Sequence, residues 1–156
     1  MIPSTVERVP LNTSSEINAR IRRQTEERVA WTSRRGPEAI HKRLEELDHE
    51  WDIERVLEAN ASSLMLVGVA LGAKVDRKFL AIPAAVAGFL LMHAVQGWCP
   101  PLPILRRLGI RTQAEIEAER YALKAMRGDF RNSAQDGPRD LRRAEDSLRA
   151  ARTGRA

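Results

Sequence analysis

The single cysteine of this 156-residue chain, Cys99, is the first candidate for chemistry. It lies in the stretch VQGWCPPLPILRRLGIRT, residues 95–112, before two prolines and a few residues before Arg106 and Arg107. A reactive thiolate needs nearby cations or a helix N-terminus, whereas Cys99 follows a segment that we expect to be helical. The two arginines could offset this only if the chain folded back. We predict a structural role for Cys99, with a sulfur-transfer or redox role as the alternative.

The histidines do not suggest a metal site. His93 and Cys99 are six residues apart, and His41 and His49 are eight apart, which does not give the facing pairs of a zinc site. An ionisable residue in an apolar stretch is a functional hypothesis, but we expect His93, near the end of its stretch, to reach water. No serine–histidine–aspartate order, phosphate loop or carboxylate pair stands out. The sequence predicts no enzyme, no catalytic residue, no cofactor and no metal.

The elements that would position these residues are two apolar stretches in the middle of the chain. The second, FLAIPAAVAGFLLMHAVQGW, covers residues 79–98, and no Asp, Glu, Lys or Arg occurs in 79–105. A helix of this length spans about 30 Å, the thickness of bilayer hydrocarbon. Its large apolar side chains together favour insertion by about 4 kcal/mol, and Trp98 would lie at headgroup depth. We predict a transmembrane helix here.

The first apolar stretch, ANASSLMLVGVALGA at residues 59–73, is shorter. As a helix it spans only about 22 Å, but Lys74, Arg77 and Lys78 can extend to the far interface. A water-soluble oligomer with both helices in its core is the alternative. Neither stretch has a polar face, however, and a helix that is apolar all round lies in a core or in a membrane. We predict an all-α fold: a membrane helical hairpin of two transmembrane helices with amphipathic or charged helical flanks.

Small residues in both stretches suggest where helices pack. Gly68 and Gly72 form a G-x-x-x-G pair on the same face as Ala61 and Met65, and the second stretch has a strip of small residues that includes Ala84 and Gly88. In lipid, close backbone approach supplies much of the association energy. We predict helix packing through Gly68, Gly72, Ala84 and Gly88. The partner is either the other helix of the hairpin or a second chain.

The flanks carry helix signals. Residues 13–16, TSSE, match a capping box before a helix that we expect to end at Trp31. Pro37 suits the first position of a further helix, with an apolar stripe at Ile40, Leu44, Leu47 and Trp51. Thr112 and Glu115 form a second capping box, before a helix that stops at Gly128. The predicted segments are 1–36, polar with a short helix; 37–58, an acidic amphipathic helix; 59–112, the transmembrane hairpin; and 113–156, a charged helical flank with a basic tail.

After Trp98 the chain is expected to leave the membrane. Pro100, Pro101 and Pro103 prevent a helix from continuing, and Gly109 permits a turn. Leu102, Ile104 and Leu105 are expected at the interface. Attraction to anionic lipid headgroups fits the arginines of this segment, so we predict headgroup contacts for Arg106, Arg107 and Arg111.

The order of residues around Cys99 resembles the closing signature of the YgaP-like transmembrane domain family. That signature is an apolar helix followed by glycine, cysteine and proline, then a glycine that leads into a threonine, here Gly97, Cys99, Pro100, Gly109 and Thr112. The resemblance covers roughly residues 52–112, and the doubled proline and the Arg106–Arg107 pair depart from the simplest form. It implies a small helical-hairpin domain of the bacterial inner membrane, often a homodimer and sometimes joined to a rhodanese domain. It transfers no biochemical activity.

These patterns predict an integral membrane protein that acts as an anchor or interaction module, with the lipid bilayer as its first partner. A homo-oligomer and a membrane or sulfur-metabolism partner protein are further expected partners. Nucleic acid is not expected, because basic and acidic residues alternate and aromatic residues are scarce. The flanks are rich in arginine and the first residues lack an apolar signal segment, so we expect the bacterial inner (plasma) membrane with both termini in the cytoplasm.

Overall fold

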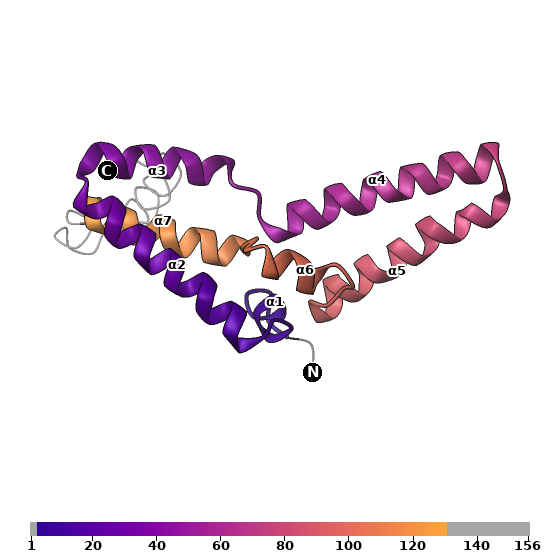
Figure 1. The fold of residues 1–156 in the computed structure, drawn as a ribbon, viewed down its shortest axis with the longest axis horizontal. Helices are drawn as coiled ribbons and strands as arrows, with labels where there is room; N and C mark the ends of the chain where they lie inside the picture. The colour runs from indigo at the N-terminus through magenta and orange to yellow at the C-terminus, as the bar shows by residue number, and fades with distance from the viewer. Residues whose placement is uncertain (1–2, 131–156) are drawn as a thin grey trace, which may run out of the picture. The chain divides into compact units, whose positions relative to one another are not determined.

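The computed structural model describes residues 3–130, and every regular element in that range is a helix (Figure 1). The all-α class is confirmed, and α4 and α5 carry the two stretches that are long and apolar enough to cross a membrane. The basic tail of the predicted segment 113–156 lies outside the described part. The elements are α1 (Arg8–Leu11), α2 (Ser15–Arg34), α3 (Pro37–His49), α4 (Ile53–Lys74), the 3₁₀ helix η1 (Arg77–Leu80), α5 (Ala81–Gln96), α6 (Leu102–Arg107) and α7 (Gln113–Arg127).

The chain divides into two compact units. The first contains Met1–Arg23 and Trp51–Ile116, and the second contains Gln24–Glu50 and the described residues from Glu117 onward. Two of the boundaries fall inside α2 and α7, and the third falls between α3 and α4. The four consecutive segments drawn from the sequence differ from these units, because the N-terminal residues pack with the segment that follows α5.

The predicted single helix over residues 37–58 is wrong. α3 ends at His49, and Glu50 has extended backbone angles (φ −68°, ψ 128°). Asp52 then caps a new helix, since its carboxylate accepts a hydrogen bond from the backbone N–H of Arg55 at 2.9 Å. Helix α4 therefore begins at Ile53 and runs without a break through the first apolar stretch.

Within the first unit, α4 and α5 run side by side and are joined through η1 (Figure 1). Gly68 and Gly72 are buried on the side of α4 that contacts the second apolar segment. A Cβ at Gly68 would lie 2.6 Å from Cδ of Pro83, and a Cβ at Gly72 would lie 2.5 Å from a methyl carbon of Leu80. These two glycines therefore permit the close approach of the two segments within one chain.

The small-residue strip of α5 does not take part in this contact. Ala84 and Gly88 are exposed, and a Cβ at Gly88 would meet no atom within 4 Å. The partly buried side of α5 carries larger residues, among them Ile82, Pro83 and Val86. Packing of Ala84 and Gly88 against α4 is thus excluded, and a role of these two residues in contacts with a second chain stays a prediction.

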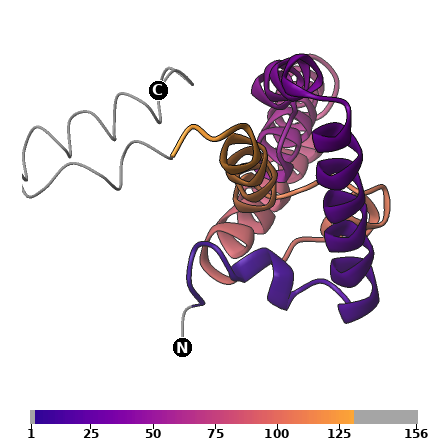
Figure 2. The ribbon, with the colours of Figure 1, turned by 90° about the vertical axis from the view of Figure 1, so that its left-hand side faces the viewer.

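The second unit is built from α3 and parts of α2 and α7, which lie next to one another in Figure 2. Ile40, Leu44 and Leu47 are buried, as the apolar stripe predicts. Pro37 is the first residue of α3 after Gly36, whose φ of 92° is the left-handed conformation that glycine tolerates. Trp51, the fourth member of the predicted stripe, lies beyond the end of α3 and is exposed.

A buried carboxylate ties this second unit together. Glu119 on α7 is fully buried and accepts hydrogen bonds from Arg43 of α3 at 2.8 Å and from Arg28 of α2 at 3.4 Å. Burial would lower the pKa of Arg43, but the carboxylates of Glu119 and Glu46 raise it above its usual value, so the guanidinium stays charged.

Replacement of Gly68 by alanine should destabilise the packing of α4 against α5, because the new methyl group must displace the rigid ring of Pro83. Overpacking of this kind costs about 1–3 kcal/mol. Gly88→Ala is the matched control: it adds the same methyl group where there is space and should raise helix stability by about 0.5–1 kcal/mol. Thermal unfolding of the purified protein in detergent measures both, and equal effects would contradict the packing described.

Candidate functional site

The polar residues of the first unit gather where α5 ends. Helix α5 stops at Gln96, and Gly97 adopts a left-handed conformation with φ 78°. A Cβ at Gly97 would lie 2.3 Å from the backbone oxygen of Arg8, so only glycine fits against the N-terminal segment. The side chains of Arg8 and Asn12 donate hydrogen bonds to the backbone oxygens of Ala94 and Gln96, each at 2.8 Å. The N-terminal segment thus supplies partners for carbonyl groups that the end of a helix leaves free.

A chain of charged groups lies beside this contact. Arg8 donates to Oε1 of Glu54 at 2.8 Å, and Oε2 of Glu54 lies 3.0 Å from Nε2 of His93. His93 is only 3% exposed, so the prediction that it reaches water is wrong. Glu54 comes from the first turn of α4 and His93 from the last turn of α5. One carboxylate therefore links the N-terminal segment to both apolar helices.

Cys99 is buried in the apolar core of the same unit. Its neighbours there are Val9, Ile53, Leu57 and Leu102, with Leu105 and Ile110 packed against them. A free cysteine in such surroundings acts as a small apolar residue. This location agrees with the predicted structural role.

The largest polar network in this unit surrounds Arg106, which is fully buried. Nη1 and Nη2 donate to the two carboxylate oxygens of Glu115 at 2.7 Å each, the paired geometry in which arginine binds carboxylate most strongly. The remaining donors reach the side chains of Thr13 and Asn18 and the backbone oxygen of Ile110, at 3.2, 2.9 and 3.1 Å. Because arginine has five N–H groups, every donor of Arg106 has a partner.

Glu115 also closes the predicted capping box at the start of α7. The N–H of Thr112 donates to Oε2 of Glu115 at 2.8 Å, and the N–H of Glu115 donates to the Thr112 hydroxyl at 3.2 Å. Burial alone would raise the pKa of Glu115, but hydrogen bonds from Arg106 and Thr112 and the charge of Arg106 hold that pKa below the ordinary 4.5. The capping box predicted for Thr112 and Glu115 is confirmed, as is the end of the helix before Gly128.

Headgroup contact is excluded for two of the three arginines predicted to make it. Arg106 is committed to Glu115, and Arg111 is only 3% exposed. A buried guanidinium whose N–H groups already donate to protein atoms cannot donate to a lipid phosphate. Arg107 does have an exposed side chain, so headgroup contact stays a prediction for that residue.

The prolines after Cys99 open a helix instead of carrying the chain away in an extended form. Pro101 is the residue before α6, and Pro103 lies in its first turn. Pro100 is exposed in the turn between α5 and α6, while Gly109, at φ 87°, follows the end of α6. Leu102 is fully buried, so of the residues expected at the interface it is Ile104 whose side chain is largely exposed. Apart from the exposed Pro100, the residues of the sequence signature thus have defined structural roles in the connection from α5 to α7.

The other predicted capping box, at residues 13–16, does not form. The hydroxyl of Thr13 donates to the backbone oxygen of Val9 and accepts from Arg106. Ser14 caps α2 in its place, since its Oγ accepts a hydrogen bond from the N–H of Ile17 at 3.4 Å. The helix runs to Arg34, three residues past the predicted end at Trp31.

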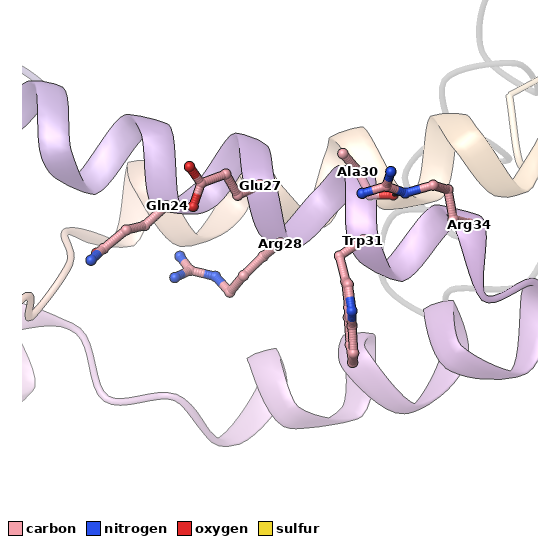
Figure 3. A pocket seen from close by; sticks show the side chains of 6 residues that line it. All are labelled: Gln24, Glu27, Arg28, Ala30, Trp31 and Arg34. Atoms are coloured by element: carbon pink, nitrogen blue, oxygen red, sulfur yellow. Dashed lines mark hydrogen bonds between the residues drawn. The ribbon is translucent and has the colours of Figure 1, made fainter.

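A depression on the surface of α2 is the remaining candidate for a ligand site. Figure 3 shows its six lining residues, all from this one helix: Gln24, Glu27, Arg28, Ala30, Trp31 and Arg34. Arg28 is paired with Glu119, and the Trp31 ring stacks with the guanidinium of Arg35 at 4.1 Å. No acid–base pair converges on this surface. Among residues 3–130, no group of three or more His, Cys, Asp or Glu side chains could hold a metal ion.

Comparisons with known proteins give no identity to this arrangement. No protein-family model matches the chain. No curated protein and no solved structure matches it either. The function therefore has to be inferred from the geometry of the chain itself.

Sequence reasoning found Cys99, Gly97 and Thr112 but missed the residues that hold them. Arg8, Glu54 and Asn18 were not singled out, and Arg106 was assigned to lipid. Glu54 lies five residues before the first apolar stretch and has Asp52 and Glu58 as neighbouring acids, so nothing in the sequence set it apart. The partner itself could not be chosen, since Arg8 lies 46 positions away.

Replacement of Arg106 by glutamine should strongly destabilise the first unit. Loss of one member of a buried ion pair costs about 3–5 kcal/mol, because the other charge is left uncompensated. Arg107→Gln removes a neighbouring guanidinium that is exposed and should change the free energy of unfolding by less than about 0.5 kcal/mol. Denaturant unfolding in detergent compares the two variants. Similar losses would show that the Arg106 network adds no particular stability.

The lowered pKa of Glu115 predicts a loss of stability in acid. The carboxylate contributes its full stabilisation above the unfolded pKa, and this contribution disappears as the pH falls through the lower pKa of the folded state. The wild-type protein should therefore lose more stability than Glu115→Gln between about pH 5 and pH 2. Unfolding curves recorded across that range give the difference, which also cancels the effects of other acids. Parallel curves would contradict an ionised Glu115 paired with Arg106.

Proposed function

We propose that the chain is an integral membrane protein in which α4, from about residue 59, and α5 cross the bilayer as a helical hairpin. The observation that carries this proposal is the outward orientation of their large apolar side chains. The exposed residues on the two helices are Leu64, Leu66, Val67, Val69, Phe89, Leu91 and Val95. Soluble monomers rarely expose contiguous apolar surface beyond a few hundred Å². These side chains therefore need lipid or another protein to shield them from water.

The low burial of these helices argues against a water-soluble core. Only 17% of the apolar window that ends in α4, and 6% of that in η1 and α5, is buried. A core helix of a soluble protein is mostly buried by its own chain. Lipid tails provide the cover without any further protein.

The ends of the helices also fit a bilayer. From about residue 59 to its end at Lys74, α4 spans about 24 Å as a helix, so its apolar part is short and depends on charged side chains at the turn to reach the far interface. Lys74, Arg77 and Lys78 are exposed at the turn, where they can reach headgroups. Trp98 is 38% exposed at the opposite end, a position where aromatic residues favour the interface.

The role that follows is an anchor or interaction module. Apart from the hairpin, the described residues form helical flanks held by ion pairs, which provide surfaces outside the bilayer. The resemblance to the YgaP-like family supports a location in the bacterial inner membrane, and the arginine-rich flanks support cytoplasmic termini. Self-association through the free face of α5 that contains Ala84 and Gly88 stays a prediction.

Charge placed on the outer face of the hairpin tests the proposal. An arginine at the centre of a spanning helix costs about 2.5–3.5 kcal/mol, so the double variant Leu66→Arg, Leu91→Arg should be released from membranes by alkaline carbonate, whereas the wild-type protein stays in the pellet. Ala125→Arg, on an exposed position of α7, is the control and should stay with the wild type. Wild-type protein that is released by carbonate, or is monodisperse in buffer without detergent, would overturn the assignment.

A further inference from the structure

Trp51 and Arg55 form an exposed pair at the start of α4 that neither the core nor the spanning helices use. The guanidinium carbon of Arg55 lies 4.4 Å from the centroid of the Trp51 ring, the geometry of a cation–aromatic contact. The Trp51 side chain is 49% exposed, and that of Arg55 is exposed as well. The apolar spacing of residues 40–51 predicts Trp51 on the buried stripe of α3, so its position outside the core calls for another role.

The guanidinium of Arg55 keeps its N–H groups available. In the described part of the chain it stacks on Trp51, and no carboxylate forms an ion pair with it. Two neighbouring acids are engaged elsewhere. The carboxylate of Asp52 accepts from the backbone N–H of Arg55, and the carboxylate of Glu54 contacts Arg8 and His93. Stacking therefore orients this cation without neutralising it.

The pair lies at the same end of the hairpin as Trp98. Glu54, the residue before Arg55, lies 3.0 Å from His93 in the last turn of α5, so the start of α4 is level with the end of α5. Trp98 follows that end and is partly exposed. Arg55 comes four residues before the proposed start of the span, which is about 6 Å along the helix axis. With the hairpin in a bilayer, Trp51 and Arg55 lie at its surface.

We propose that Trp51 and Arg55 bind the headgroup of an anionic phospholipid. The inference rests on the proposed membrane hairpin and names a lipid contact at one end of it. The planar guanidinium donates to the phosphate oxygens, for which its fork of N–H groups is suited. The Trp51 ring lies at the boundary of the hydrocarbon, where tryptophan is favoured. An unneutralised cation prefers a lipid with net negative charge, because a choline headgroup carries a cation of its own.

The depth of Trp51 is the first test. The chain has three tryptophans, so the double variant Trp31→Phe, Trp98→Phe leaves Trp51 as the fluorophore, and Trp31→Phe, Trp51→Phe leaves Trp98 as the reference. Each full-length variant is placed in lipid nanodiscs whose phosphatidylcholine carries bromine, a fluorescence quencher, near the headgroup end of one acyl chain. Both tryptophans should be quenched. Quenching of Trp98 alone would overturn the lipid site and leave the hairpin standing, whereas quenching of neither would overturn both.

The choice of lipid is the second test, with Trp51 again as the fluorophore. A small fraction of brominated phosphatidylglycerol in phosphatidylcholine discs is compared with the same fraction of brominated phosphatidylcholine. One arginine at an anionic surface should enrich the anionic lipid about fivefold, which is about 1 kcal/mol, so phosphatidylglycerol should quench more strongly. Arg55→Gln should remove this excess, and Arg55→Lys should keep part of it, since lysine retains the charge without the fork. Equal quenching by the two lipids would overturn the anionic preference.

Arg22→Gln is the matched control for the loss of one positive charge. Arg22 is an exposed arginine of α2, and its replacement changes the net charge as Arg55→Gln does. The excess quenching of Trp51 by phosphatidylglycerol should persist in this variant. A loss as large as that of Arg55→Gln would mean that the net charge of the protein attracts the lipid, and would overturn a specific role for Arg55.

Discussion

The fully satisfied guanidinium of Arg106 is the interaction on which the rest of the first unit depends. A buried charge costs several kcal/mol unless its donors and its charge are matched, and Arg106 achieves this only with partners from α2, the segment before it and the start of α7. These segments cannot shift independently without leaving a donor unpaired. Because Glu115 is also a cap of α7, the ion pair and the first turn of that helix form or break together.

The unit thus combines two kinds of construction. At one end, charged and polar side chains fasten short helices to one another with hydrogen bonds that reach across the sequence. Along α4 and α5, small residues allow two backbones to approach, and most large apolar side chains face away from the protein. The first kind of packing needs exact partners, whereas the second leaves large apolar side chains exposed on the outer faces of the two helices. Glu54 and His93 lie where the two meet.

The sequence was informative where the signal is local. Pro37, the Thr112–Glu115 box and Gly128 each act within about one helical turn, the apolar stretches are continuous runs of residues, and each lies where its pattern indicates. Prediction failed where a residue far away in the sequence determines the surroundings of a side chain. Arg106 next to an apolar stretch looks like a headgroup ligand until Thr13, 93 positions away, is placed beside it. The break at residues 50–52 was missed because the apolar spacing continues to Trp51, although Asp52 starts a new helix.

The hydrogen bonds that attach residues 8–18 to the rest of the first unit have a consequence for biosynthesis. Arg8, Asn12, Thr13 and Asn18 find their partners in residues 54–106, of which the later ones leave the ribosome only after the whole apolar region has been made. These groups of the N-terminal segment therefore stay without their partners until the apolar region has been synthesised. Closure of the N-terminal segment is therefore a late event in synthesis, because its partners lie in and after both apolar helices.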